Sequence, residues 1–289
     1  MSIKKSELIL NPDGSVYHLN LKPENIAKNI IFVGDLNRVD KVTKHFESID
    51  FTTQKREFKT VSGYYKNKRL TVISTGIGSD NIDIVLNELD ALVNIDLDTR
   101  AIKKELTQLN IIRIGTSGSL QKDIPIDSFL VSSYAIDLSG MLLSYQVDEI
   151  SHPKIEEAFI KHTNWNEKKS YPIVVANSID LGKKLSSKNI YQGITATAGG
   201  FYGPQGRVLR LAIQDPELNH KIDSFNFEGN RITNLEMETS AIYGLSKLLG
   251  HHAVSMNAII ANRANGTFSE NPYKVVDNLI LYTLDKIVS

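Results

Sequence analysis

The sequence predicts a single α/β domain in which helices cover a mostly parallel or mixed sheet. Short apolar segments alternate with longer segments of helical periodicity along the 289-residue chain, and this alternation is typical of α/β proteins. Several short segments are apolar at consecutive positions, as expected for strands that are buried on both faces. No linker rich in Pro, Gly or Ser and no internal repeat interrupts the chain, so we expect one domain over residues 1–289.

The expected elements follow one another in a regular order. Apolar segments predict strands at 29–34, 70–75, 111–116, 128–133, 171–176, 192–197 and 253–261. Helical periodicity predicts helices at 38–47, 81–93, 97–109, 153–163, 178–187, 237–249 and 271–287. Ligands of open α/β sheets collect at the carboxyl ends of the strands. The residues after each strand are therefore the first candidates for a functional site.

The composition argues against several classes of function. Lys plus Arg and Asp plus Glu number 33 each, so no global charge would attract nucleic acid or an anionic membrane. The absence of cysteine excludes disulfides, a thiol nucleophile and cysteine-ligated zinc. The sequence has neither a signal-peptide pattern nor an apolar run of about 20 residues. We therefore expect a cytoplasmic protein that binds neither nucleic acid nor membranes.

Glycine-rich turns follow three of the predicted strands. The first strand leads into Gly34 and Arg38, the second into TGIGSD, and the third contains Arg113 and ends in GTSG. Glycine lets backbone N–H groups close around an oxyanion, and a following helix adds positive potential. Any single βα loop needs glycine for structural reasons alone, but three together predict a phosphate site. The patterns match neither a Walker loop nor a complete dinucleotide fingerprint.

Charged residues also occur at positions where apolar ones are expected. Arg113 stands in the apolar segment IIRIG, where an arginine requires an internal ion pair or a bound anion. Glu236 and Glu238 flank Met237 just before a predicted helix. Two carboxylates are suited to acid–base chemistry or to a sugar diol, but they would also stabilise the start of a helix. The residues alone leave both alternatives open in each case.

The segment FYGPQGR (201–207) combines aromatic residues, a Gly-Pro turn and two planar polar side chains. Gln205 and Arg207 are two positions apart, so in an extended chain they would point to the same side. Amide and guanidinium groups are suited to the edge of a flat polar ligand. The alternative is a surface loop without a ligand.

Six segments together resemble the hexameric-type nucleoside phosphorylases, and most of all the uridine phosphorylase branch. They are VGDLNRV, STGIGSDN, IIRIGTSG, FYGPQGR, LEMETSA and AIIANR, in the order found in that family, and the resemblance covers roughly residues 15–288. It implies a three-layer α/β/α fold whose mixed central sheet is partly barrel-like. It also implies a pentosyltransferase of pyrimidine salvage that converts uridine and phosphate to uracil and ribose 1-phosphate, without an organic cofactor.

The resemblance assigns roles to individual residues. It implies phosphate binding by Gly34, Arg38, Arg56, Arg113 and Thr116, ribose binding by His18, Met237 and Glu238, and base binding by Phe201, Gln205, Arg207 and Arg263. Arg56 and His18 match residues that a neighbouring subunit donates, which implies a homo-oligomer with active sites shared across a dimer interface. Some bacterial members hold a monovalent cation near the positions of Glu57 and Ile77, but Asn81 replaces the serine of that site.

Two departures bear on specificity and assembly. Purine-specific relatives carry an aspartate after the strand that matches AIIANR, whereas this chain has Ile259, Ile260, Ala261 and Asn262. This favours uridine, and it leaves thymidine and deoxyuridine open. Residues 94–102 look like an insertion that resembles the dimeric animal enzymes, so the choice between dimer and hexamer is open.

Three alternatives differ in what they require of the site. A nucleosidase of the same superfamily uses water in place of phosphate, which would not need the cluster formed by Arg38, Arg56 and Arg113. A phosphorylase of broader specificity would accept purine or deoxypyrimidine nucleosides. A nucleoside-binding protein without catalysis would be expected to lack Glu238 or one of these arginines.

Overall fold

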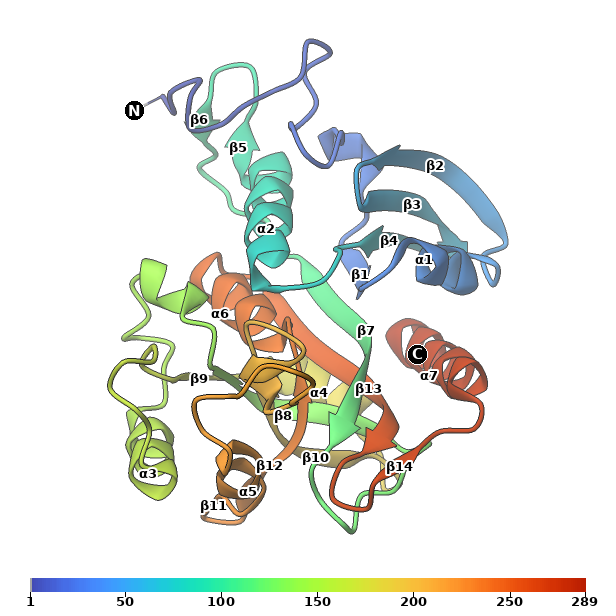
Figure 1. Cartoon of the computed structure of the whole chain (residues 1–289). Coiled ribbons are helices and arrows are strands. Elements are labelled where there is room, and N and C mark those ends of the chain that lie inside the picture. Colours follow the sequence, from blue (N-terminus) through green and yellow to red (C-terminus); the bar gives the residue numbers. More distant parts are fainter. Residues whose placement is uncertain (1) are drawn as a thin grey trace.

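The computed structural model describes residues 2–289 and confirms the α/β class (Figure 1). The strands are β1 (Asn29–Val33), β2 (Ser48–Lys55), β3 (Phe58–Tyr65), β4 (Lys68–Ser74), β5 (Ile95–Asp96), β6 (Ala101–Ile102), β7 (Asn110–Ser119), β8 (Phe129–Asp137), β9 (Ile173–Ala176), β10 (Tyr191–Thr197), β11 (Asn226–Phe227), β12 (Asn230–Glu236), β13 (His252–Asn262) and β14 (Thr267–Phe268). The α-helices are α1 (Leu36–Thr43), α2 (Ser79–Asn94), α3 (Pro153–Thr163), α4 (Ile179–Leu185), α5 (Leu218–Asp223), α6 (Thr239–Leu248) and α7 (Pro272–Val288).

The main sheet is mixed and closes partly on itself. Strands β7, β13, β8, β10 and β12 form a ring, because β12 pairs with β7 as well as with β10. Strands β1, β4, β3 and β2 extend this ring from β7 as an open sheet. Strand β1 is parallel to both β4 and β7, whereas β13 is antiparallel to β8. The expected mixed, partly barrel-like sheet is therefore confirmed.

Helices cover both faces of the sheet, and alternate residues of β1 show why. Ile30 and Phe32 belong to the apolar cluster that includes α2 and α6, whereas Ile31 and Val33 belong to the cluster that includes α1 and α7. All four side chains are buried, as predicted for a strand between two helical layers. In Figure 1, α2 and α7 lie on opposite sides of β1 and β7. The three-layer α/β/α arrangement is confirmed.

One predicted helix is wrong. Residues 97–109 contain the turn and second strand of the β5–β6 hairpin, followed by a segment without regular secondary structure. The carboxylate of Asp96 accepts hydrogen bonds from the backbone N–H and the hydroxyl of Thr99, and such local bonds compete with helix formation. Ile102 and Leu106 are exposed, so a helix here would have no apolar partner for these side chains.

Every predicted strand and every other predicted helix overlaps an observed element, but several elements were not predicted. The β2–β3 hairpin turns at Arg56 and Glu57 rather than at the Asn-Gly or Asp-Gly pair that usually marks a two-residue turn. Arg56 adopts a left-handed φ of 55° there. Strand β12 was also missed, although it closes the ring.

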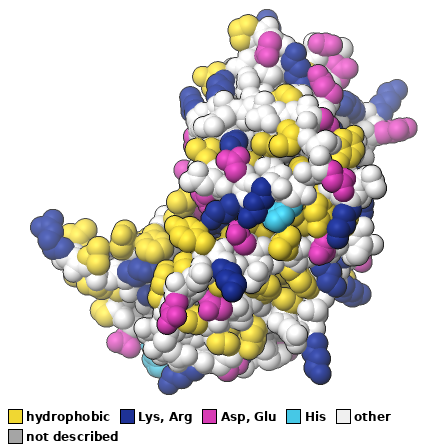
Figure 2. Space-filling model, turned by 90° about the vertical axis from the view of Figure 1, so that its right-hand side faces the viewer, with side chains coloured by type: hydrophobic (Ala, Val, Ile, Leu, Met, Phe, Trp, Pro, Cys, Tyr) yellow, Lys and Arg dark blue, Asp and Glu magenta, His cyan; other side chains and the backbone are white. Residues whose placement is uncertain are grey.

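The surface shows no broad patch of one charge on the face seen in Figure 2, where basic, acidic and apolar side chains are interspersed. This mixture agrees with the equal numbers of acidic and basic residues, 33 each. Among residues 2–289, no helix combines the length and apolar character needed to cross a membrane.

Candidate active site

A cavity of ≈ 290 Å³ lies where β1, β7 and β12 end, near the lower limit for small-molecule sites. The predicted site residues that line it are Gly34, Arg38, Arg113, Thr116, Phe201, Gln205, Arg207, Met237 and Glu238. The fold thus brings together side chains from segments that are more than 200 positions apart in the sequence.

The first glycine turn places Arg38 at the start of α1. The carboxylate of Asp35 accepts from the backbone N–H of Arg38 at 2.9 Å and also pairs with its guanidinium at 3.1 Å. Arg38 Nη1 donates to the carbonyl of Ile114 on β7 at 3.3 Å. Burial lowers the pKa of Arg38, which Asp35 opposes, but an arginine stays charged at neutral pH. The positively charged Arg38 side chain is therefore fixed beside the N-terminus of α1 at this part of the cavity.

Arg113 forms the internal ion pair that was one of its two predicted alternatives. Its side chain, with the residue 8% exposed, lies 2.6 Å from Glu238 and 3.1 Å from Glu236. Burial opposes the charge of Arg113, but the two carboxylates outweigh it and raise its pKa. Arg113 also lines the cavity, so the ion pair and an anion ligand do not exclude each other.

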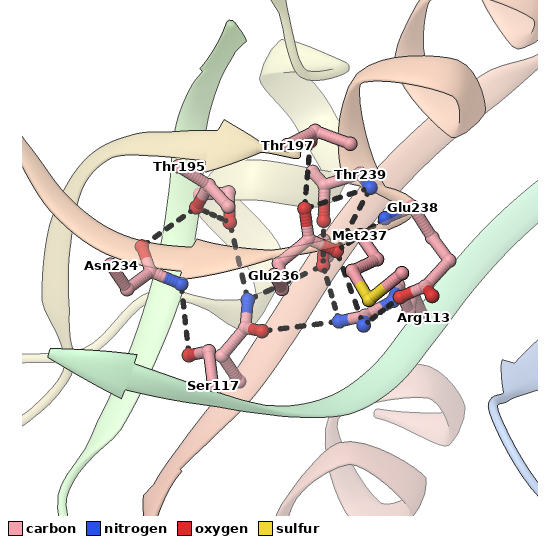
Figure 3. Close-up of polar contacts among 12 residues, drawn as sticks. Arg113, Ser117, Thr195, Thr197, Asn234, Glu236, Met237, Glu238 and Thr239 are labelled. Carbon is pink, nitrogen blue, oxygen red and sulfur yellow. Dashed lines mark hydrogen bonds and ion pairs between the residues drawn. The ribbon is translucent and has the colours of Figure 1, made fainter. Parts of the chain in front are cut away.

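Glu236 accepts hydrogen bonds from backbone N–H groups at the start of α6 (Figure 3). This is the structural alternative that the sequence left open for the acidic pair. The Glu236 carboxylate accepts from the backbone N–H groups of Glu238 and Thr239, each at 2.9 Å, and from the hydroxyl of Thr197 at 2.7 Å. Burial raises the pKa of Glu236. These contacts occupy both carboxylate oxygens, so Glu236 acts chiefly as an anchor for the helix.

Glu238 is held differently and stays at the cavity wall. Its Oε1 accepts from the backbone N–H of Gly78 at 2.9 Å, while its Oε2 pairs with Arg113. Gly78 has a φ of +105°, which favours glycine, so the GIGS turn can reach the carboxylate. The hydroxyl of Ser79 donates to the carbonyl of Met237 at 3.2 Å. The second glycine turn therefore fixes the Met237–Glu238 pair.

The FYGPQGR segment is compact rather than extended, which corrects the prediction that an extended chain aligns its two polar groups. Gly203–Gln205 form a 3₁₀ turn, and Gly206 follows with a φ of +69°. The polar groups still meet, because Arg207 Nη1 donates to Gln205 Oε1 at 2.5 Å. Arg263 Nη1 donates to the carbonyl of Gln205 at 2.6 Å. Burial, together with the charge of Arg207, lowers the pKa of Arg263 to about 10.

Phe201 lies under the guanidinium of Arg207, whose carbon is 3.9 Å from the ring centre. Arg207 also donates to the carbonyl of Phe201 at 2.7 Å. Burial lowers the pKa of Arg207. The Arg207 guanidinium is thus fixed by stacking and by two hydrogen bonds at the edge of the cavity.

Comparison with known proteins agrees with this geometry. Residues 28–281 match the profile of the Phosphorylase superfamily. The chain belongs to this superfamily. The uridine phosphorylase of Thermococcus kodakarensis is 29% identical over 264 residues, which cover 89% of this chain and 81% of that protein. A DeoD-type purine nucleoside phosphorylase of Bacillus thuringiensis is 25% identical over 274 residues, covering 94% and 98%.

Solved structures of nucleoside phosphorylases are also similar to this member of the phosphorylase superfamily. A nucleoside phosphorylase of Trypanosoma brucei, described as showing uridine phosphorylase activity, has a TM-score of 0.85 and 29% identity, covering 96% of this chain and 99% of the other. A uridine phosphorylase of the oomycete Phytophthora capsici is 22% identical with a TM-score of 0.75, covering 100% and 99%, and supports the fold. The resemblance drawn from the six segments is confirmed.

Three predicted site residues of this phosphorylase-superfamily chain, His18, Arg56 and Arg263, do not line its cavity. Arg56 is exposed at the tip of the β2–β3 hairpin. His18 Nδ1 lies 2.6 Å from Glu88 Oε1, and the backbone N–H of His18 donates to the same carboxylate. Arg56 and His18 were predicted to reach the site of a neighbouring subunit, and that role stays a prediction.

The positions considered for a monovalent cation lie close together. The amide of Asn81 is 3.4 Å from the carbonyl oxygen of Ile77 and donates to it. A Cβ built on Gly76 would meet both Asn81 and the Cγ atom of Glu57, at 2.4 and 3.2 Å. The carbonyl that would face a cation thus already accepts an amide N–H. Within residues 2–289, no group of three or more His, Asp or Glu side chains is arranged to hold a metal.

Sequence reasoning missed the polar partners behind the cavity wall. Ser255 and Asn257 lie in β13 and are buried. Arg113 Nη1 is 3.1 Å from Asn257 Oδ1 and 3.5 Å from Ser255 Oγ. The sequence signal that could have identified Ser255 and Asn257 is the one that identified Arg113. Both are polar residues in an otherwise apolar strand, AVSMNAIIA (253–261).

Proposed function

We propose that this chain is a uridine phosphorylase, which converts uridine and phosphate to uracil and ribose 1-phosphate. One observation carries the proposal: a single cavity joins three chemically distinct parts. Arg38 and Arg113 supply cations, Glu238 supplies a carboxylate in contact with Arg113, and Gln205 with Arg207 supplies an amide and a guanidinium. Phosphate, ribose and a pyrimidine need these three kinds of group in that order.

The phosphate end accounts for the nucleophile. A phosphate oxygen attacks C1′ of the ribose as the bond from C1′ to N1 of uracil breaks, and the bonding electrons leave with the base. Arg38, Arg113, Thr116 and the N–H groups after Gly34 would hold the phosphate in line with that bond. A nucleosidase is less well supported, because attack by water needs no such cluster of cations.

The ribose position accounts for the carboxylate. Charge develops positively on the sugar as the bond to the base breaks, as in glycoside hydrolysis. Glu238 Oε1 and Oε2 would accept hydrogen bonds from the 2′ and 3′ hydroxyls. The Met237 side chain offers an adaptable apolar wall beside the sugar. A protein that only binds nucleosides could use the carboxylate for the ribose but would not need two arginines beside it.

The base end accounts for the leaving group. Arg207 holds Gln205 Oε1, which directs the Gln205 Nε2 group away from Arg207. Donors from both side chains would then meet the carbonyl oxygens of uracil as negative charge develops on the ring. Fixed donors of this kind stabilise the transition state more than the ground state. Arg263 supports the arrangement through the carbonyl of Gln205.

The choice of pyrimidine over purine rests on where the acidic residues lie. The acidic residues that line the cavity are Asp35, Glu236 and Glu238, and all three are held at the starts of α1 and α6. The residues of FYGPQGR and β13 that line the cavity offer no acid to protonate a purine ring nitrogen. Relatives named uridine phosphorylase support this choice, and the purine nucleoside phosphorylase relatives keep broader specificity as the second candidate.

The proposal includes a shared active site. Arg56 and His18 would complete the phosphate and ribose positions of a neighbouring copy, so the working unit would be at least a dimer of this single domain. No organic cofactor is part of the proposal, since phosphate itself is the co-substrate. Pyrimidine salvage in the cytoplasm would be the setting.

Uracil release with and without phosphate tests the proposal. Purified protein is incubated with uridine in phosphate-free buffer or with added phosphate, and uracil is followed by chromatography. We expect release only when phosphate is present, with ribose 1-phosphate as the second product. Equal release without phosphate would indicate a nucleosidase, and no release in either buffer would contradict the assignment of uridine as the substrate.

A further inference from the structure

Arg113 has two independent sets of partners, and only one of them faces the cavity. Its Nη2 atom contacts Glu238 and Glu236, at 2.6 and 3.1 Å. Its Nη1 atom contacts Asn257 and Ser255. Glu238 and Glu236 line the cavity, whereas Asn257 and Ser255 do not. The guanidinium is thus held by two carboxylates on its cavity side and by two side chains of β13 on the side away from the cavity.

Substrate binding would weaken the contact on the cavity side. Glu238 is the carboxylate proposed to accept hydrogen bonds from the ribose hydroxyls, and the same Oε2 atom accepts from Arg113. When the ribose hydroxyls also donate to Glu238, the hydrogen bond from Arg113 to this carboxylate becomes weaker. Arg113 would then lose part of its support while phosphate and ribose are both bound. The contacts of Nη1 are out of reach of the substrate, so they persist through the reaction.

The amide of Asn257 has one orientation that fits its surroundings. Its Nδ2 group donates to the hydroxyls of Ser132 and Ser255, at 3.2 and 3.3 Å. Its Oδ1 atom is therefore left to accept from Arg113 at 3.1 Å. Asn257 is 0% exposed, so the packed ring of strands around it, rather than solvent, fixes the amide.

The choice of an amide instead of a carboxylate at this position is chemically informative. Arg113 already faces two carboxylates, and a third negative charge would reduce its attraction for phosphate. A neutral acceptor anchors the guanidinium without neutralising it. Asparagine offers that acceptor and has a short side chain with few rotamers to order.

We propose that Asn257 is a positioning residue that holds the Arg113 guanidinium in place for phosphate while Glu238 engages the ribose. The inference rests on the proposed phosphorolysis of uridine. Asn257 touches neither substrate, so its effect passes through Arg113. The signature of this role is a loss of affinity for phosphate that is not matched by a loss of affinity for uridine.

Steady-state kinetics of Asn257→Ala and Asn257→Asp test the inference. We expect Asn257→Ala to raise the KM for phosphate about tenfold, as for loss of a hydrogen bond to a charged group, with the KM for uridine changed less than about twofold. Asn257→Asp keeps the size and the acceptor but adds a charge, so its KM for phosphate should rise further. Asn94→Ala is the matched control, because Asn94 is also buried and hydrogen-bonded, but its partners are Asp90 and Thr107 instead of Arg113.

The outcomes separate this inference from the proposed function. If the wild-type protein releases no uracil in the presence of phosphate, the proposed function fails before any variant is compared. If the wild type is active but Asn257→Ala leaves the KM for phosphate within about twofold, the positioning role is wrong. Equal rises in both KM values, with a fall in Tm like that of Asn94→Ala, would likewise show a general packing defect instead.

Discussion

At the scale of single residues, the site depends on charged groups that are paired before any ligand arrives. Arg113 with Glu238, Arg38 with Asp35, and Arg207 with Gln205 each form contacts of 2.5–3.1 Å. Buried or half-buried charges of this kind are costly unless they are paired. The same pairs keep the groups in fixed positions, which is what catalysis by positioning and electrostatic stabilisation requires.

Arg207 carries a prediction about the leaving group. Substituting Arg207→Ala removes a donor from the base end and also frees the amide of Gln205, so kcat should fall about 100- to 1,000-fold. The KM for phosphate should change far less, because the arginines at the other end are untouched. Steady-state kinetics with each substrate varied in turn would measure both values.

The matched control for this substitution is Arg210→Ala. Arg210 is exposed on the same loop and does not line the cavity, so its loss should leave kcat close to the wild-type value. A variant at Arg207 that raises only the KM for phosphate would mean that its guanidinium serves phosphate rather than the base.

At the scale of elements, β7 combines an arginine with the glycine that makes room for it. Arg113 and Gly115 are two positions apart and share a face of the strand. A Cβ built on Gly115 would lie 1.9 Å from Arg113 Nη1 and 2.3 Å from its Cζ atom. The guanidinium therefore packs against the bare backbone, and Gly115 is part of the reason that Arg113 reaches both carboxylates.

Substitution of Gly115→Ala should displace Arg113 and damage both stability and turnover. We expect a lower Tm, because moving one partner of a buried ion pair is costly, and a fall in kcat/KM of about 100-fold, as for a misplaced catalytic group. Thermal unfolding and kinetics measure the two effects. Gly199→Ala is the control, since its Cβ would meet no atom closer than 3.4 Å; equal behaviour of the two variants would refute the packing argument.

The elements also show what could be read from the sequence. Strand β1 was predictable because its apolar run has to be buried on both faces, and the residues at the ends of the first three predicted strands identified part of the cavity wall. The hairpin of β2 and β3 was missed because Arg56 adopts a left-handed φ without glycine. The helix expected at 97–109 failed because Asp96 captures Thr99 in a local turn. Such side-chain bonds depend on geometry that periodicity does not contain.

The contact partners of individual site residues could not be predicted from the sequence, for a different reason. The sequence indicated that Arg113 needs a counter-charge or an anion, but not that Glu236, Glu238 and Asn257 surround it. Those contacts join β7 to β12, α6 and β13, and they follow from the closure of the ring. That closure depends on the pairing of β12 with β7, and β12 itself has no strong strand signal.

At the scale of the whole molecule, the closed ring supports the site from behind. Asn234 donates to Ser117 and Thr195 donates to Asn234 (Figure 3). Asn257 donates to Ser132, so buried polar side chains connect the strands of the ring. The open extension of β1 to β4 ends in the hairpin that carries Arg56. The ring and the end of β1 thus provide the cavity wall, and the far end of the extension carries the hairpin that the proposal assigns to a neighbouring copy.

The measurement that tests the account most directly is a comparison of uridine, thymidine, cytidine, inosine and methylthioadenosine as substrates in the presence of phosphate. The proposed site would offer fixed donors to a pyrimidine and no acid to a purine, so kcat/KM for uridine should exceed that for inosine by about 100-fold or more. Cytidine should also be poor, because its amino group would face the Arg207 guanidinium, donor to donor. Efficient cleavage of inosine, at a rate equal to or above that of uridine, would contradict the assignment of the base end.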